Sequence, residues 1–262
     1  MIYANPIVGR TGLCNMLVPW ARAEVFAKKT GAKILAPRWT NYFRIGHLLR
    51  NERNRYYLNE FTNKGYVSGL ERLVTIALRK HVGEGLFSSG MDNIVVDFRG
   101  MDGFMEPFFG EHDYILGRLR SIADPGILKR VESLSKSAYI GVHVRRGDFC
   151  STRLAIDDKW YVEAIREARE RAGNLPVWVF SDAPPRQLWG ITSKFDDITI
   201  MPKMPALQDL LVLSNAKIIV GTSRSSFSYW AIYLGQSQSI LHPVYSEKPD
   251  PLYLDGRTPV LL

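Results

Sequence analysis

Cysteine is scarce in this chain of 262 residues, which contains only Cys14 and Cys150 and no CxxC pair. This excludes a disulfide framework and a cysteine-rich zinc site and favours a reducing compartment. Long apolar runs are also absent, because no stretch approaches the roughly 18 uncharged residues of a membrane-spanning helix. The opening MIYANPIVGRTGLCN lacks the basic segment and apolar core of a secretory signal. We therefore expect a cytoplasmic protein that reaches membrane-bound material, if at all, from the membrane surface.

Several catalytic and metal-binding signatures are missing as well. The sequence has no HExxH, no GxSxG, no Walker A stretch and no DxD triplet. The acidic pairs Asp157-Asp158 and Asp196-Asp197 have a different spacing. If the substrate is a diphosphate, these absences predict that protein cations, and no metal or other cofactor, balance its charge. The net charge of +8 is mild and does not choose among nucleotide, anionic lipid and nucleic acid.

What the sequence does have is an apolar fraction of 46%, enough for a sizeable core. Short β-branched or aromatic runs alternate with helical patterns in the second half of the chain. Near-continuous apolar strands separated by helices predict a parallel sheet covered on both faces. The predicted strands are 33–36, 93–98, 138–144, 177–181, 198–201, 217–221 and 239–242, and the clearest predicted helices are 159–172, 206–216 and 225–235.

The first half is less regular. Residues 70–83 predict an amphipathic helix with Leu70, Leu73, Val74 and Ala77 on one side. The turn Asp124-Pro125-Gly126 predicts a boundary between two lobes. We therefore expect an α/β protein with an N-terminal lobe at 1–125 and a C-terminal lobe at 126–262.

The stretch YIGVHVRRGD (139–148) is an apolar strand that ends in two arginines and an aspartate. His143 and Arg145 alternate with valines, so they share one face of the strand end. Ligands of parallel α/β sheets bind at the carboxyl ends of strands, and an arginine there can grip a phosphate bidentately. Asp148 could accept hydrogen bonds from a neighbouring arginine and fix its rotamer. The alternative is a structural Arg–Asp pair that caps the strand.

Two further strands end in polar groups. Asp182 follows VWVFS, where a carboxylate can accept hydrogen bonds from guanine or can cap the next helix. The strand before GTSRSSFS leads into a helix that begins near Ser225, and a helix start with free N–H groups can hold an anion. Ordinary N-capping by serines is the alternative. An arginine, a carboxylate and a helix start at three consecutive strand ends suit one nucleoside diphosphate.

At this point the residues resemble a known family. HVRRGD is similar to the HxRRxD motif of the α1,2- and α1,6-fucosyltransferases. GRTGLCNML resembles their glycine-rich N-terminal loop, VFSDAP their strand-end Ser-Asp, and DLLVLSNAKIIVGTSRSSFSYWAIYLG their last motif. The chain departs from that pattern at Gly9-Arg10, which replaces a double glycine, at Met16, and at Arg224.

The resemblance implies a GT-B-like fold of two facing Rossmann-type lobes with mainly parallel sheets. It implies an inverting, metal-independent glycosyltransferase that moves L-fucose from GDP-β-L-fucose to a hydroxyl of a glycan acceptor. Arg145 would hold the β-phosphate and Asp148 is one candidate for the general base, with Asp157 and Asp158 as others. The remaining residues implied at the donor or the reaction centre are His143, Arg146, Asp182, Ser225, Ser226, Phe227, Gly12 and Asn15.

Two rival interpretations stay open on the sequence alone. One is a glycosyltransferase of the same fold that uses another nucleotide sugar. The other is a basic nucleic-acid-binding protein, because 38–80 holds nine Lys/Arg against three Asp/Glu among aromatic residues. These aromatic residues are Trp39, Tyr42, Phe43, Tyr56 and Tyr57. We expect the enzyme, with no nucleic-acid partner.

Overall fold

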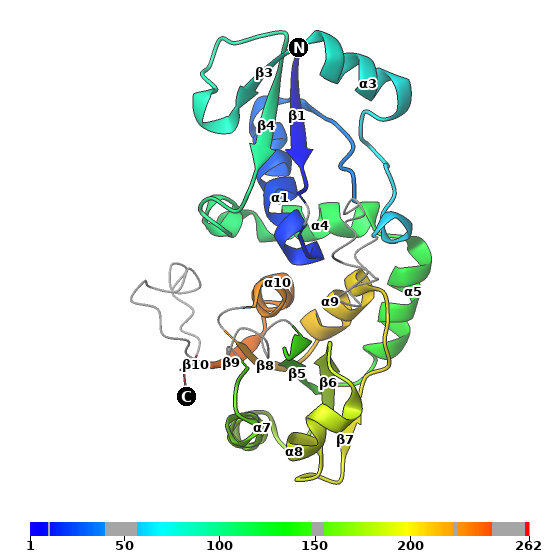
Figure 1. The fold of residues 1–262 in the computed structure, drawn as a ribbon, viewed down its shortest axis with the longest axis vertical. Coiled ribbons are helices and arrows are strands. Elements are labelled where there is room, and N and C mark those ends of the chain that lie inside the picture. The colour runs from blue at the N-terminus through cyan, green and yellow to red at the C-terminus, as the bar shows by residue number, and fades with distance from the viewer. Residues whose placement is uncertain (10, 40–56, 148–154, 223–224, 243–259, 262) are drawn as a thin grey trace. The chain divides into compact units, whose positions relative to one another are not determined.

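The computed structural model describes residues 1–9, 11–39, 57–147, 155–222, 225–242 and 260–261. It divides into two compact units, Met1–Pro125 and Gly126–Leu262, called here the N-terminal and the C-terminal unit (Figure 1). Each unit carries its own sheet, and every described strand pairing is parallel. None of the helices in these ranges is both long and apolar enough to cross a membrane.

The sheet of the C-terminal unit has six strands in the order β10-β9-β8-β5-β6-β7. Strand order runs outwards in both directions from β5 and β8, which is the doubly wound arrangement of dinucleotide-binding folds. The strands are β5 (Ile140–Val144), β6 (Val177–Ser181), β7 (Ile198–Ile200), β8 (Ile218–Thr222), β9 (Gln238–His242) and β10 (Val260–Leu261). The reversal between β5 and β8 is where such sheets leave a crevice at their carboxyl edge.

Helices cover both faces of this sheet, as Figure 1 shows, with α9 and α10 on one side and α7 and α8 on the other. The helices are α5 (Pro125–Leu134), α7 (Asp158–Ala172), α8 (Trp189–Thr192), α9 (Ala206–Ser214) and α10 (Ser226–Gly235), with a 3-10 turn η4 (Pro185–Leu188). The Asp157 carboxylate accepts from the N–H of Lys159 and begins α7, and Gly173 follows its last residue. Burial of aliphatic side chains between these layers supplies roughly 1.5–3 kcal/mol for each one.

A glycine sets how closely α9 packs on the strand that leads to the site. A Cβ on Gly141 of β5 would lie 2.6 Å from Leu213 and 2.9 Å from Ala216. Because those are core atoms with no room to move, only glycine allows this helix so near the strand. The approach places the start of α10 beside the end of β5, since α10 packs on α9 and on β8.

The N-terminal unit has a four-stranded sheet in the order β2-β1-β4-β3. Its strands are β1 (Ile2–Ile7), β2 (Lys33–Ile34), β3 (Lys80–Gly83) and β4 (Ile94–Arg99). Its helices are α1 (Leu13–Thr30), α3 (Gly69–Leu78) and α4 (His112–Ile122), joined by 3-10 turns η1 (Leu58–Glu60), η2 (Glu84–Leu86) and η3 (Glu106–Glu111). Gly31 adopts φ 72° after α1, a left-handed geometry that glycine accepts at low cost.

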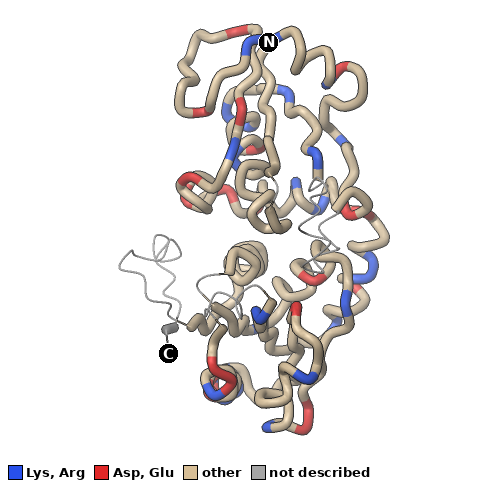
Figure 2. The backbone as a smooth tube through the Cα atoms, viewed as in Figure 1, with Lys and Arg blue, Asp and Glu red and all other residues tan. Residues whose placement is uncertain are grey.

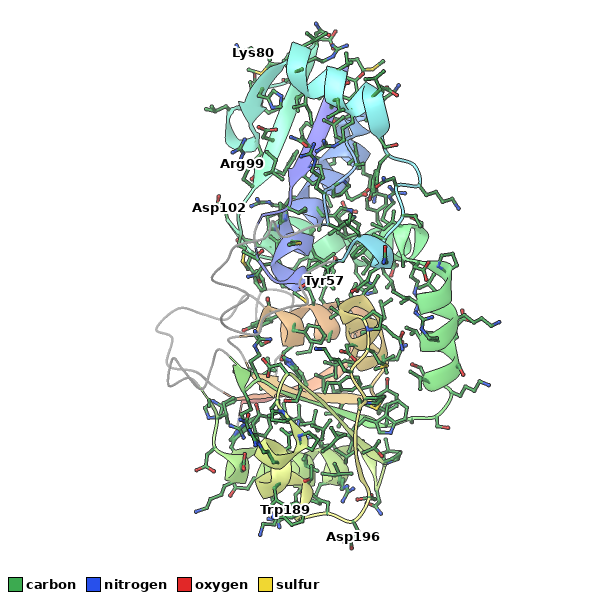
Figure 3. All side chains as sticks on the ribbon, turned by 45° about the vertical axis from the view of Figure 1, so that its right-hand side comes forward. Tyr57, Lys80, Arg99, Asp102, Trp189 and Asp196 are labelled. Atoms are coloured by element: carbon green, nitrogen blue, oxygen red, sulfur yellow. The ribbon has the colours of Figure 1, made fainter. Side chains whose placement is uncertain are left out.

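The helix predicted over 70–83 is corrected in two ways. It ends at Leu78, and 80–83 form the edge strand β3 (Lys80 is labelled in Figure 3). Its predicted apolar side is exposed: Leu70 is 76%, Leu73 53% and Val74 47% accessible. The opposite side packs inward through Thr75 and through Ile76, which contacts the cluster of Tyr3, Leu35 and Val95. Periodicity gave the helix but could not say which of its sides faces the sheet.

Candidate active site

Four of the predicted site positions meet at the carboxyl ends of β5, β6 and the start of α10. These are His143, Arg145, Asp182 and Phe227, all in the C-terminal unit. The structure joins them in two contacts: the His143 and Phe227 rings have centroids 4.9 Å apart, and Arg145 pairs with Asp182. His143, Arg145 and Phe227 lie at the β5–β8 reversal, the position where this kind of sheet binds ligands, and Asp182 lies at the end of β6, the neighbour of β5 on its other side.

Arg145 directly follows β5, and its side chain is 30% exposed. Its Nη1 lies 3.2 Å from Oδ2 of Asp182, whose side chain is also 30% exposed. The pair is therefore partly desolvated, and the carboxylate orients the guanidinium. A cation fixed in this way at a strand end is suited to an anionic ligand.

Asp182 binds the loop after β5 more extensively than this one ion pair. Its Oδ1 accepts from the backbone N–H of Arg146 at 2.8 Å and of Gly147 at 3.1 Å. Asp182 is not the N-cap residue of the helix that follows, since the N-cap of η4 is Pro184, without a side-chain cap. The N–H of Ala183 is taken by Ser181, whose Oγ also donates to the carbonyl of Val144 at 2.7 Å. The ends of β5 and β6 are thus tied together by two adjacent side chains.

Gly147 makes this arrangement sterically feasible. A Cβ at that position would lie 2.5 Å from Asp182 Oδ2. The Asp182 carboxylate is held by the hydrogen bonds to Oδ1, so Oδ2 could not move aside without weakening those hydrogen bonds or the pair with Arg145. The sequence analysis assigned no role to Gly147, although a glycine directly after two strand-end arginines is a signal of close approach.

The side chains of Arg145 and Arg146 point in different directions, because they are adjacent residues of an extended segment. Arg146 is buried, with Nη1 donating to the carbonyl of Ile156, Nη2 bound to Asp158, and its guanidinium 5.8 Å from the Tyr161 ring centroid. These partners belong to α7 and the residues before it. In the structure these contacts anchor the loop to α7; a contact between Arg146 and the donor stays a prediction.

His143 is buried beneath the site. Its Nδ1 lies 2.9 Å from Oγ of Ser228, and that oxygen also accepts from the N–H of Thr222 at 3.4 Å. Burial, helped by the nearby positive charge of Arg145, lowers the pKa of His143 to about 4, so the ring is neutral at pH 7. The neutral ring carries one proton, on Nδ1 in the tautomer that donates to Ser228 and on Nε2 in the tautomer that accepts from the Ser228 hydroxyl. Ser228 was missed by the sequence analysis, although it belongs to the same serine run.

The serines at the start of α10 lie where the sequence predicted a helix start. Ser225 is the N-cap residue and is buried, its side chain makes no capping hydrogen bond, and Ser226 and Phe227 form the first turn. Gly221 allows this turn to approach β8, since a Cβ there would meet Ser228 Oγ at 2.6 Å. Tyr229, Trp230 and Tyr233 are buried, as expected for core residues.

The remaining predicted residues fall elsewhere. Gly12 is the N-cap of α1 and Asn15 lies on its first turn, half-buried, in the N-terminal unit. Asp148, together with Arg10, Cys150 and Arg224, is outside the described residues. Of the other candidate bases, Asp157 caps α7 and Asp158 pairs with Arg146. Among the residues that the structure describes, no group of three or more His, Cys, Asp or Glu could hold a metal ion.

The aromatic residues behind the nucleic-acid alternative do not form an exposed platform where they are described. Trp39 is 2% exposed and stacks on Phe61 at 4.0 Å. Tyr57 is buried, and its hydroxyl accepts from the N–H of Leu13 (labelled in Figure 3). Lys and Arg are intermixed with Asp and Glu along both units (Figure 2). Tyr42, Phe43 and Tyr56 lie outside the described residues.

Comparison with known proteins identifies the family of the chain. The sequence profile of glycosyl transferase family 11 matches residues 94–250, more than half of the chain. An α-1,2-colitosyltransferase of Escherichia coli is 33% identical over 104 residues, which cover 36% of this chain and 36% of that protein. The match thus spans about a third of that relative's length.

Two solved structures share the fold at low sequence identity. NodZ α-1,6-fucosyltransferase of Bradyrhizobium, soaked with GDP-fucose, has a TM-score of 0.58 at 17% identity, covering 88% of this chain and 92% of that one. POFUT1 in complex with GDP-fucose has a TM-score of 0.53 at 12% identity, covering 92% and 97%. The predicted α/β fold of the GT-B type, with mainly parallel sheets, is confirmed.

Proposed function

The chain belongs to glycosyl transferase family 11, and on that premise we propose that it is a glycosyltransferase that moves L-fucose from GDP-β-L-fucose to a glycan hydroxyl. The single observation that carries the proposal is the strand-end constellation of Arg145, Asp182 and the α10 start at the sheet's reversal point. NodZ and POFUT1, which share the fold, have each been studied with GDP-fucose.

We propose direct, inverting displacement at the anomeric carbon. The glycan hydroxyl forms the new bond, the bond to the β-phosphate oxygen breaks, and GDP leaves with the electron pair. Negative charge grows on the diphosphate as this bond lengthens. Arg145 and the N–H groups at the start of α10 stabilise that charge more in the transition state than in the ground state.

We propose that the reaction needs no metal, because Arg145 and the positive end of α10 supply the charge that a divalent cation would otherwise supply. A general base must still accept the proton of the acceptor hydroxyl. Asp148 stays a candidate, and it lies outside the described residues. Asp157 and Asp158 are less suited to the role, since the first caps a helix and the second holds Arg146.

A second donor is favoured by one specific finding, the 33% identity to an α-1,2-colitosyltransferase. Colitose lacks one hydroxyl group of fucose. A pocket built to hydrogen-bond that hydroxyl would reject colitose strongly, whereas a pocket without such partners would discriminate only weakly. The ratio of kcat/KM for GDP-fucose and GDP-colitose therefore separates the two donors.

The proposed function is tested first by binding. GDP should raise the melting temperature of the protein in proportion to RT ln(1 + [L]/Kd), whereas UDP and dTDP should not. Fucose transfer to a glycan panel should continue in excess EDTA, and NMR of the product should show the α-anomer. A shift with UDP or dTDP in place of GDP, or a β-linked product, would contradict the proposal, and loss of transfer in EDTA would contradict its metal-independent form.

A further inference from the structure

We propose that Asp182 is a positioning residue that holds Arg145 and the 145–147 backbone in register, and that it does not read the guanine base. The inference rests on the proposed function, since it concerns how the same site recognises a nucleoside diphosphate. It departs from the role that the family resemblance implies for Asp182.

The hydrogen-bond partners of the carboxylate are the first observation. Oδ1 receives the two backbone N–H groups of Arg146 and Gly147, at 2.8 and 3.1 Å, and Oδ2 faces the Arg145 guanidinium at 3.2 Å. All three partners belong to one loop. A carboxylate that accepts two N–H groups and one cation from the same loop fixes that loop as a unit. A base reader would instead keep an oxygen edge directed at the ligand.

Sequence distance and sterics give a second, independent observation. Position 182 lies at the end of β6, and its partners lie at the end of the neighbouring β5. Gly147 has no side chain, and a Cβ there would come within 2.5 Å of Oδ2. A side chain at position 147 would therefore displace either the loop or the Asp182 carboxylate. Ser181 reinforces the junction by donating to the carbonyl of Val144.

The consequence is a division of labour in ligand recognition. If Asp182 acts through Arg145, its loss weakens the grip on the β-phosphate and leaves recognition of the base intact. If Asp182 reads guanine, its loss weakens every guanine nucleotide and abolishes the preference over hypoxanthine, which lacks the exocyclic amino group. The two roles thus predict opposite selectivity changes in the same variant.

The experiment measures Kd of GDP, IDP and GMP for the wild type and for Asp182→Ala by calorimetry on the full chain. We expect Asp182→Ala to weaken GDP and IDP by the same factor, about tenfold or more, as for the loss of a hydrogen bond to a charged group. GMP has no β-phosphate and should change less than twofold. A loss of affinity for GMP equal to that for GDP, or a change in the GDP-to-IDP ratio, would overturn the inference.

A second variant displaces the Asp182 carboxylate without changing residue 182 itself. Gly147→Ala should displace Asp182 Oδ2 and reproduce the selectivity pattern of Asp182→Ala, with GDP and IDP weakened together and GMP spared. Its matched control is Gly85→Ala, because nothing lies within 4 Å of a Cβ at Gly85. Wild-type selectivity in Gly147→Ala would contradict the proposal even if Asp182→Ala folds poorly.

Asp197→Asn is the control for removing an aspartate from an arginine pair in the same unit. Asp197 accepts from Arg169 at 2.5 and 2.6 Å, on α7 and away from the strand ends. Asp197→Asn should leave the affinities for GDP, IDP and GMP unchanged. If wild-type protein binds none of GDP, IDP and GMP, the proposed function fails; if it binds them and the ratios move as a base reader requires, only the inference fails.

Discussion

Two arginine–carboxylate pairs, one in each unit, use the same chemistry for different ends. Arg118 of α4 binds Glu24 of α1 through Nε at 2.9 Å and Nη2 at 3.2 Å, and the Glu24 side chain is fully buried. Arg145 and Asp182 pair at strand ends, and each side chain is 30% exposed. The first joins two helices inside the N-terminal unit, whereas the second stands at a carboxyl edge that ligands can reach.

The surroundings of the two pairs explain the difference. Glu24 also accepts from the hydroxyls of Tyr66 and Tyr114, and Tyr66 accepts from Trp20 at 2.8 Å. Burial and the adjacent Glu24 charge raise the pKa of Tyr66, and they raise the pKa of Tyr114 to about 12, so both stay protonated donors. Arg118, Tyr66 and Tyr114 thus all donate to the Glu24 carboxylate and stabilise its negative charge. Asp182 instead binds residues 145–147, which include Arg145, the arginine proposed to bind the diphosphate of the donor.

The largest stability effect should come from breaking the buried pair. Glu24→Ala leaves the Arg118 guanidinium without its carboxylate and both tyrosine hydroxyls without their acceptor. We expect about 3–5 kcal/mol of destabilisation, measured by urea unfolding at pH 7. Asp182→Ala is the comparison and should cost clearly less, because its pair is partly solvated. Equal losses of unfolding free energy in the two variants would contradict the distinction between the buried pair and the partly exposed pair.

A second effect should appear in the pH dependence of unfolding. His143 has a pKa of about 4 in the folded protein against an ordinary value of 6.5. The unfolded chain therefore binds the proton first, and stability present above pH 6.5 is lost as pH falls towards 4. The loss should total about 3 kcal/mol, from 1.36 kcal/mol for each pKa unit.

The matching variant for this prediction is His143→Gln. The difference in unfolding free energy between wild type and variant should shrink by that amount between pH 7 and pH 4, because the carboxylates titrate in both proteins. A pH-independent difference would show that position 143 is not held neutral by burial.

The smallest effect should come from the exposed pair of Arg169 and Asp197. The Arg169 hydrogen bond lowers the pKa of Asp197, but 47% of the aspartate side chain is accessible and solvent screens the interaction. Asp197→Asn should change unfolding free energy by no more than about 0.5 kcal/mol. A loss comparable to that of Glu24→Ala would show that exposure does not rank these pairs.

Much of the C-terminal unit could be predicted from sequence, because its signals are local. The apolar run of β6 fits 177–181, and α7 begins where Asp157 caps it. The N-terminal unit was predicted less well. Strand β1 was missed because Asn5 and Pro6 interrupt its apolar pattern, although Asn5 is buried and donates to Asp97 at 2.8 Å. A polar residue that donates a hydrogen bond across the sheet cannot be told from a loop residue in one sequence.

The candidate site shows the same limit. Sequence placed Arg145 and Asp182 at strand ends, but their contact depends on β5 and β6 being neighbours in the sheet. Spacing could not reveal that Asp182 turns to the 145–147 loop, that Arg146 turns to α7, or that Ser228 supports His143. Such pairings arise between segments many residues apart and follow from packing.

The measurement that tests the central claim most directly is donor turnover by Arg145→Ala. The account predicts that kcat for transfer and for GDP-fucose hydrolysis falls by about 10²–10³, or about 3–4 kcal/mol in barrier, as for loss of one preorganised oxyanion donor. Unfolding free energy should stay close to that of the wild type, since this side chain is partly exposed. Turnover within a few-fold of wild type in a folded variant would contradict the account.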